Sequence, residues 1–175
     1  GRTDLIKVRE KTVTKRAAMA DLSQILYSDN SAPQEDKHFK ADNVFNFELE
    51  KTVDEAVIIP AFKTALKTGK PKAIDIEVSS TNRTLGTIFG SEITKKYKNT
   101  LPDDTYTINC KGGGGQSFGA FIPKGLTIRL TGDSNDYFGK GLSGGKLIVA
   151  PPENAKYRAE ENIIIGNVAL YGATS

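Results

Sequence analysis

The chain has 175 residues, of which 38% are hydrophobic and 26% charged, and its 24 basic and 21 acidic residues give a net charge of +3. This length and balance predict a soluble chain of one domain, or of one domain and a small appendage. The basic residues form no run and are not interleaved with aromatic residues, and no apolar stretch reaches the length of a membrane span or a signal peptide. We therefore expect no nucleic-acid partner and no membrane partner, and the single cysteine, Cys110, favours a reducing, cytoplasmic compartment.

Residues 1–70 are predicted to form a linker followed by a helical wrap. Asp21 is a candidate N-cap for a short helix through Tyr27, because its carboxylate can accept an N–H of the first turn. Residues 43–50 (NVFNFELE) alternate in polarity and predict a strand or an extended arm.

A longer helix is predicted over roughly residues 53–68. Thr52 and Glu55 form a capping box at its start, and Gly69 is placed to end it. Pro60 lies inside this helix and is expected to kink it or to split it in two, because proline lacks the backbone N–H and its ring clashes with the preceding turn.

Residues 72–79 (KAIDIEVS) predict the first strand. Their alternation places Ile74, Ile76 and Val78 on one buried face. Residues 91–98 predict a second helix, which interrupts the first coil before the regular repeats begin.

Residues 105–150 repeat with a period of 20. Each unit contains a short β-branched run, a turn, a small-residue run with Phe-Gly, and another turn, and 11 of the 17 glycines lie between positions 112 and 145. A fixed period near 20, with strands too short to stand alone, is typical of a solenoid. Residues 71–175 are therefore predicted to form a mainly β domain, a parallel β-helix. Two inward ladders are expected from residues in equal positions: Ile108, Ile128 and Ile148 in the first, Phe118 and Phe138 in the second.

The end of the chain predicts an incomplete array. Residues 151–161 are an insertion, and residues 162–171 (NIIIGNVALY) predict the next pair of strands. The chain begins with Gly1 and stops at Ser175 without a capping element, so we expect a fragment truncated at its C-terminus. An uncovered last coil is a template for pairing with another chain, and we expect self-association through it, as a dimer.

Three short patterns resemble catalytic motifs but lack the required context. Residues 139–144 (GKGLSG) match the dinucleotide fingerprint, which needs a helix after it, whereas a strand and two prolines follow here. Residues 115–119 (GQSFG) and 141–145 (GLSGG) match the nucleophile elbow, but the only histidine, His38, precedes both serines in the chain. We expect neither cofactor binding nor hydrolysis at these positions.

Isolated polar residues also predict no site. His38 has no histidine or cysteine partner with which to hold zinc, and residues 111–115 (KGGGG) lack the Gly-Lys-Ser/Thr ending of a phosphate-binding loop. Cys110 occupies the repeat column of Leu130 and Ala150, which favours a small buried side chain over a reactive thiol.

One acidic turn could hold a cation weakly. It contains Asp133, Asn135 and Asp136, for which turn capping by the side chains is the simpler interpretation. The sequence therefore predicts no catalytic, cofactor-binding or metal-binding residue.

Several segments closely resemble the C-terminal domain of the glutamate synthase large subunit, which carries the GXGXG repeat. The specific segments are residues 115–121 (GQSFGAF), 135–149 (NDYFGKGLSGGKLIV) and 161–174 (ENIIIGNVALYGAT), with residues 1–5 (GRTDL) and 81–97 (TNRTLGTIFGSEITKKY) also similar. The resemblance covers roughly residues 72–175 with high specificity and the earlier part weakly. The chain departs from the family at Gly113 and Gly114 and in lacking the final repeats. The resemblance implies that the β-helix is right-handed.

The resemblance also implies a function for the parent protein. Glutamate synthase makes two glutamates from glutamine and 2-oxoglutarate, passes ammonia through an internal tunnel, and takes electrons from NAD(P)H or ferredoxin. An amidotransferase and a flavin barrel carry that chemistry with FMN and an iron–sulfur cluster, and the C-terminal domain holds the other domains in register. No catalytic residue of the family maps onto this sequence. The implied role is a non-catalytic scaffold whose partners are the other domains of its own chain.

Two other classes are weighed against this one. A β-helix subunit of the formylmethanofuran dehydrogenase type shares the glycine repeat, but residues 161–174 and the helical wrap favour glutamate synthase. A polysaccharide-cleaving β-helix would need carboxylates or arginines clustered on one strand face, and the repeat faces carry Ile, Thr and Leu instead.

Overall fold

The computed structural model describes residues 5–6, 14–16, 19–27, 31, 41–42 and 44–175. Internal contacts divide the chain into two compact units, Gly1–Asn46 and Phe47–Ser175, and the predicted domain boundary after residue 70 stays a prediction. In the first unit, helix α1 spans Ser23–Leu26. Asp21 Oδ1 accepts the N–H of Ser23 at 2.9 Å, so this short helix begins beside the predicted acidic residue.

The predicted strand or arm at residues 43–50 is not a strand in its described part. Residues 44–48 have no regular secondary structure, and Leu49–Lys51 form a short 3₁₀ helix, η4. The strands of the sheet come from later parts of the chain, in the order β1-β2-β3-β4. His38 and Asn43 lie outside the described residues.

The predicted helix at 53–68 is present but changes type along its length. A π-helical segment, η5, spans Asp54–Ile58, and α2 continues over Ile59–Thr68 with Pro60 in its first turn. The change just before Pro60 has a direct cause, because proline can donate no N–H to the turn behind it. Gly69 ends α2 with φ 71°, and its N–H donates to the Ala65 carbonyl, as the sequence predicts.

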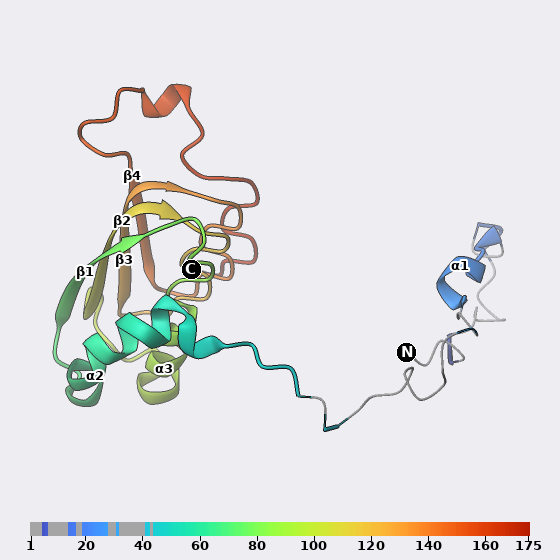
Figure 1. Ribbon diagram of the computed structural model, residues 1–175, viewed down its shortest axis with the longest axis horizontal. Helices are drawn as coiled ribbons and strands as arrows, with labels where there is room; N and C mark the ends of the chain where they lie inside the picture. Colours follow the sequence, from blue (N-terminus) through green and yellow to red (C-terminus); the bar gives the residue numbers. More distant parts are fainter. Residues whose placement is uncertain (1–4, 7–13, 17–18, 28–30, 32–40, 43) are drawn as a thin grey trace. The chain divides into compact units, whose positions relative to one another are not determined.

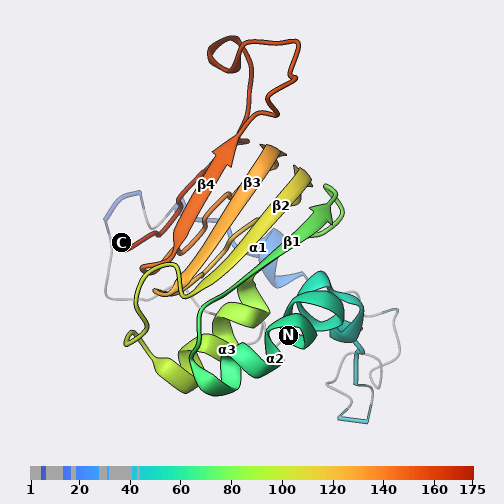
Figure 2. The same cartoon turned by 90° about the vertical axis from the view of Figure 1, so that its left-hand side faces the viewer.

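A single parallel sheet forms the centre of the second unit (Figure 2). Its strands are β1 (Lys72–Val78), β2 (Tyr106–Gly114), β3 (Leu126–Ser134) and β4 (Lys146–Ala150), in the order β1-β2-β3-β4. Helix α3 (Thr87–Tyr97) lies in the connection between β1 and β2. Helices α2 and α3 lie at the end of the sheet where its strands begin, in both views (Figures 1 and 2).

Part of the core lies between one face of the sheet and these helices. Phe62 of α2, Phe89 of α3 and Tyr106 of β2 are fully buried, and their ring centroids lie 4.7 to 5.8 Å apart. Tilted and edge-on contacts at this spacing favour aromatic clusters beyond the gain from burial alone. This cluster fixes the two helices to the start of β2.

The predicted fold class is wrong. The second unit combines one four-stranded parallel sheet with helices, which makes it an α/β arrangement and not a mainly β right-handed parallel β-helix. The small-residue runs with Phe-Gly are turns in which alternate residues have positive φ angles. Non-glycine residues of a β-strand have negative φ, and Ser117, Phe121 and Tyr137 in these runs have φ near 58°, so the runs cannot extend a sheet.

These turns recur four times, and we name them rungs 1 to 4 of a turn ladder. The rungs are residues 84–88, 117–121, 137–141 and 168–172. In rungs 2 to 4 the first, third and fifth residues have φ between 57° and 69°, and in rung 1 the first and third residues have φ of 54° and 91° before α3 begins. The ladder runs beside the sheet as a stack of loops (Figure 1).

Backbone hydrogen bonds of 2.8 to 3.0 Å join each rung to its neighbours in a repeated pattern. The first N–H of a rung donates forward to the carbonyl that precedes the next rung: Thr84 to Gln116, Ser117 to Asp136, and Tyr137 to Asn167. The third N–H donates back to the second carbonyl of the preceding rung: Gly119 to Leu85, Gly139 to Phe118, and Leu170 to Phe138. The fifth N–H donates forward to the fourth carbonyl of the next rung: Phe121 to Lys140, and Gly141 to Tyr171.

The phenylalanine ladder is confirmed, and the isoleucine ladder is only partly so. The rings of Phe118 and Phe138 stack at 6.2 Å with an angle of 5° between them. Ile108 pairs with Ile128, but Ile128 then pairs with Leu147, which leaves Ile148 on the outer face and 39% exposed. The turn before β4 is one residue shorter than the turn before β3, and a one-residue slip moves a side chain to the other face of a strand.

The predicted pair of strands at 162–171 is wrong as well. Residues 151–161 leave the sheet as a projecting loop (Figure 1, top), and the chain returns through one isolated bridge between Ser134 and Ile165. Rung 4 then follows. Ile163 is 86% exposed, whereas Ile165 of the same run is partly buried and packs against the core.

Candidate functional site

Two N–H groups of the glycine motif at residues 139–144 already donate hydrogen bonds to backbone carbonyls. The N–H of Gly139 donates to the Phe118 carbonyl and that of Gly141 to the Tyr171 carbonyl, at 2.9 and 2.8 Å. A dinucleotide fingerprint must leave such groups free to meet a pyrophosphate at a helix N-terminus. Here β4 follows, as predicted, and the motif builds the ladder.

The serines of the two elbow-like patterns lie in the same architecture. Ser117 is the first residue of rung 2, with φ 58°, and its N–H donates to the Asp136 carbonyl. Ser143 is exposed in the turn that leads to β4. Strands β3 and β4 follow these turns where a hydrolase would place a helix.

Cys110 is a buried core residue. It is 2% exposed and pairs across the sheet with Leu130, as predicted, although the next residue in that row is Val149 and not Ala150. Burial, with a smaller effect from the Asp54 charge, raises the pKa of the thiol to about 12. A thiol with this pKa stays protonated at neutral pH and is a poor nucleophile.

The acidic turn after β3 serves as a backbone cap. Asp136 Oδ1 accepts the N–H of Asn167 at 2.7 Å, which joins the turn before rung 3 to the turn before rung 4. This contact spans 31 residues of the chain, so it is not the local turn cap that the sequence predicts for Asp136. Within the described part of the chain, no three histidine, cysteine or acidic side chains gather as a metal-ligand group.

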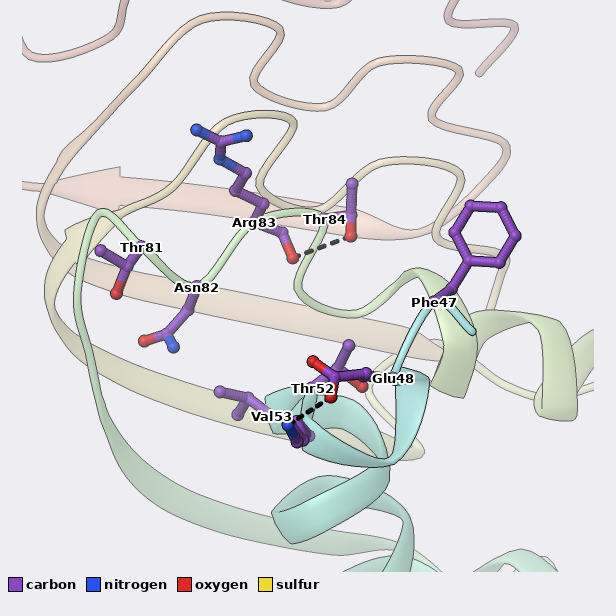
Figure 3. A pocket seen from close by; sticks show the side chains of 9 residues that line it. Phe47, Glu48, Thr52, Val53, Thr81, Asn82, Arg83 and Thr84 are labelled. Carbon is purple, nitrogen blue, oxygen red and sulfur yellow. Dashed lines mark hydrogen bonds and ion pairs between the residues drawn. The ribbon is translucent and has the colours of Figure 1, made fainter. Parts of the chain in front are cut away.

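A polar hollow of about 300 Å³ lies between η4 and rung 1 (Figure 3). It is lined by Phe47, Glu48, Lys51, Thr52, Val53, Thr81, Asn82, Arg83 and Thr84. Lys51 Nζ pairs with Glu48 Oε1, and the hydroxyl groups of Thr52 and Thr84 donate to backbone carbonyls. The Arg83 side chain points away from Glu48 and Thr52 (Figure 3). These polar groups bond to residues near them in the chain, and they do not converge on a common binding point.

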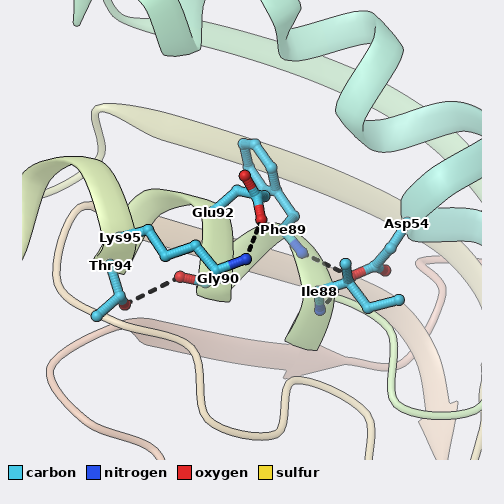
Figure 4. Close-up of polar contacts among 7 residues, drawn as sticks. All are labelled: Asp54, Ile88, Phe89, Gly90, Glu92, Thr94 and Lys95. Carbon is cyan, nitrogen blue, oxygen red and sulfur yellow. Dashed lines mark hydrogen bonds and ion pairs between the residues drawn. The ribbon is translucent and has the colours of Figure 1, made fainter.

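The most connected polar side chain is the buried carboxylate of Asp54 (Figure 4). It is 2% exposed, and its Oδ1 accepts the N–H of Gly86 at 2.8 Å. Its Oδ2 accepts the N–H groups of Ile88 and Phe89 at 2.8 and 3.0 Å. Burial raises the pKa of Asp54, and the three N–H donors act against that effect.

Asp54 performs two tasks at once. It lies at the N-terminus of α3, where free N–H groups and the helix dipole favour a negative charge. It also replaces a missing rung, because the third N–H of rungs 2 to 4 donates to a carbonyl of the preceding rung, whereas that of rung 1, from Gly86, donates to Asp54. The carboxylate thus closes the ladder where the chain turns into α3.

The sequence patterns assigned no role to Asp54, which lies between Thr52 and Glu55 of the predicted capping box. A signal was present, because the amphipathic pattern of the predicted helix places Asp54 on the same face as Ile58 and Phe62, both of which are buried. An acidic residue on the apolar face of a helix must find hydrogen-bond donors.

Comparisons with known proteins agree with the sequence resemblance. A family model described as the GXGXG motif matches residues 54–175. The chain is 46% identical over 177 aligned residues to the NADPH glutamate synthase large chain of Bacillus subtilis and 41% identical over 180 to the NADH glutamate synthase of Schizosaccharomyces pombe, with all of the chain covered in both cases. It is 33% identical over 174 residues to ferredoxin-dependent glutamate synthase 2 of Synechocystis, with 99% of the chain covered.

The chain spans only 8 to 11% of the length of these relatives. In the described ranges, none of the helices has the length and apolar character needed to cross a membrane. The family match begins at Asp54, the residue that closes the ladder, and includes all four rungs. The chain therefore belongs to the GXGXG motif family.

Proposed function

We propose that this chain is the GXGXG domain of a glutamate synthase large chain and that it scaffolds the catalytic domains without catalysing a step itself. The observation that carries the proposal is the 46% identity to the Bacillus subtilis large chain, which extends over the whole chain. The parent enzyme would make two glutamates from glutamine and 2-oxoglutarate, in a cytoplasmic compartment. The alternative of a formylmethanofuran dehydrogenase type subunit has no comparable support.

The ladder gives this scaffold a physical basis. Each rung is fixed by hydrogen bonds to rungs that lie 20 to 33 residues away in the sequence, so a local change must break long-range contacts. The Phe118 and Phe138 rings stack inside it, and Phe118 is fully buried. A body with such contacts opens only at a large free-energy cost, which suits an element that holds other domains at fixed distances.

The cofactors of the parent would lie in its other domains. Glutamate synthases use FMN and an iron–sulfur cluster, and this chain has one cysteine, which is buried and protonated. An iron–sulfur cluster is held by several cysteine thiolates. We propose that the partners of this chain are the other domains of its own polypeptide. We also propose self-association through the last coil, at rung 4.

A chimera tests the proposed function. The aligned segment of the Bacillus subtilis large chain is replaced by this chain, and glutamate formation from glutamine and 2-oxoglutarate is measured beside FMN content. We expect a folded, flavin-loaded enzyme that forms glutamate. The matched variants are Asp54→Ala, which should lose flavin content and activity together, and Lys140→Ala, which should lose neither. A chimera that loads flavin normally but forms no glutamate would refute the assignment, and full activity after deletion of the segment would refute the scaffold role.

A further inference from the structure

The sheet has one covered face and one outer face. Ile108 and Ile128 lie on the covered face, where both side chains are fully buried. Because side chains alternate along a strand, the residues next to them in each strand lie on the outer face. In Figure 2 the strands lie in front of the turn ladder, and none of the described helices of the second unit lies over them. Sheets of parallel strands are nearly always covered on both faces, so we expect the outer face to have an occupant.

Charge on the outer face is sorted by strand. β1 contributes Asp75 and Glu77, β2 contributes Lys111, and β3 contributes Arg129, and all four side chains are exposed. In the described part of the chain, none of them belongs to an ion pair. β4 adds Ile148, which is 39% exposed. The face therefore presents acidic groups along one edge, basic groups in the middle and an apolar side chain along the other edge.

A hollow of about 370 Å³ lies where the acidic and basic strands meet. Its lining includes outer-face side chains of three strands, namely Asp75, Glu77, Asn109, Lys111 and Thr131. Asn109 Nδ2 donates to Asp75 Oδ1 at 2.9 Å, so β1 and β2 are joined across this part of the face. A hollow with charges of both signs fits the polar side chains of a protein surface, because complementary charge fixes which surfaces pair and in which register.

A second copy of this chain is poorly suited to cover the whole outer face. When the strands of two copies are aligned, the twofold axis runs either along them or across them. An axis along the strands that covers all four places the basic strand β2 on the basic strand β3. An axis across the strands places each strand on itself, which brings acidic groups against acidic groups. Like charges are opposed in both arrangements, and such contacts act against a partner.

We propose that the outer face of the sheet is the docking surface for another domain of the parent polypeptide. This inference rests on the proposed function and assigns the surface through which the scaffold acts. The chain spans only 8 to 11% of the length of its relatives, so a parent of that length has other domains that can supply the occupant. The covering surface carries basic groups opposite β1, acidic groups opposite β2 and β3, and an apolar group against Ile148.

Acetylation of lysines in the wild-type sequence tests the proposal. Lys111 is exposed on the outer face and Lys63 is exposed on α2, so one chain holds both the probe and its control. Their rates of reaction with an acetylating reagent are compared between the 175-residue chain and the chimera described above. We expect Lys111 to react about tenfold more slowly in the chimera, which corresponds to a face covered about 90% of the time. Lys63 should react equally in both proteins.

Three results of this experiment would overturn the proposal. The first is an equal rate for Lys111 in the two proteins, and the second is equal protection of Lys63 and Lys111. The third is protection of Lys111 in the 175-residue chain as its concentration rises, which would assign the face to a second copy.

A charge reversal shows whether the sorted charges carry the docking. In the chimera, Arg129→Glu should return the reaction of Lys111 towards its rate in the 175-residue chain, because an acidic group would then face the acidic groups of the occupant. The matched control is Lys63→Glu, which changes the net charge by the same amount and should leave Lys111 protected. Both side chains are exposed, so both variants of the 175-residue chain should unfold in denaturant as the wild type does. Equal effects of the two variants on Lys111 would contradict the proposal.

The chimera separates this inference from the proposed function. A chimera that forms glutamate while Lys111 reacts freely refutes the docking surface and leaves the proposed function standing. A flavin-loaded chimera that forms no glutamate while Lys111 is protected refutes the assignment and leaves the docking surface standing.

Discussion

Rungs 1 and 4 of the turn ladder share positive φ at their first and third residues but have opposite surroundings. Rung 1 is closed by the Asp54 carboxylate, which accepts three N–H groups in the protein interior. Rung 4 leaves its outward N–H groups and carbonyl without partners in the described part of the chain. The contrast teaches that a repeat fixes how neighbouring rungs bond but not how the stack begins. The first rung needs a group from outside the repeat, and here that group, Asp54, lies 32 residues before Gly86.

The largest effect should follow from removal of the closing group. Asp54→Ala would leave three buried N–H groups without an acceptor, each of which costs about 1–3 kcal/mol, so we expect a loss of roughly 4–6 kcal/mol in the free energy of unfolding. Chemical denaturation measures it. The matched control is Asp136→Ala, which removes one acceptor near the open end and should cost roughly a third as much. Equal losses would show that the two ends are alike.

The aromatic stack inside the ladder should rank next. Phe138 is 5% exposed and stacks on Phe118, and truncation of a buried aromatic side chain costs about 3–5 kcal/mol. Phe138→Ala should therefore be severely destabilising. Its control, Lys140→Ala in the same rung, should be near neutral. Equal stability of the two variants in denaturant would mean that the stack does not hold the rungs together.

Two glycines in equal positions compare the inside of the ladder with its open end directly. Gly141 and Gly172 are the fifth residues of rungs 3 and 4, with φ of 62° and 68°. A Cβ at Gly141 would lie 2.4 Å from the Phe121 ring, whereas a Cβ at Gly172 meets nothing within 4 Å. Gly141→Ala should cost about 2–4 kcal/mol from strain and crowding, and Gly172→Ala about 1–2 kcal/mol from strain alone. Equal melting shifts would contradict the open edge.

The smallest effect concerns an exposed ion pair that joins the loop before β2 to β4. Lys146 Nζ lies 2.8 Å from Asp104 Oδ2, and this hydrogen bond is the main cause that lowers the pKa of Asp104 and raises the pKa of Lys146. The Asp104 contribution to stability is present at neutral pH and is lost as pH falls through its lowered pKa. The Lys146 contribution is lost as pH rises through its raised pKa.

Stability measured against pH in wild type and Asp104→Asn checks this pair. The variant should show a weaker loss of stability below the usual carboxyl range, and the difference should shrink in high salt because exposed charges are screened. A salt-independent difference would mean that the Asp104 hydrogen bond to Thr127, at 2.7 Å, matters more than the charge.

Much of the second unit was predictable from local patterns. The alternation in residues 72–79 predicts β1, the period of 20 predicts that β2 and β3 pair in register, and Gly69 ends α2 where expected. The stacking of Phe118 on Phe138 also follows from the repeat. These features depend on residues that are close in the sequence or related by a fixed period. The expectation that no catalytic residue is present remains untested.

The sequence by itself determined the four strands of the sheet, helix α2 and the spacing of the repeat, because alternation, capping and glycine placement act within a few residues. Only the tertiary structure decided the fold class, since glycine-rich runs fit both strands and turns with positive φ until their neighbours are present. It also decided the slip at Ile148, which depends on one residue in a turn. The closing role of Asp54 was beyond local reasoning for the same reason. A buried carboxylate is stable only beside donors, and those donors come from rung 1 and α3, more than 30 residues away in the sequence.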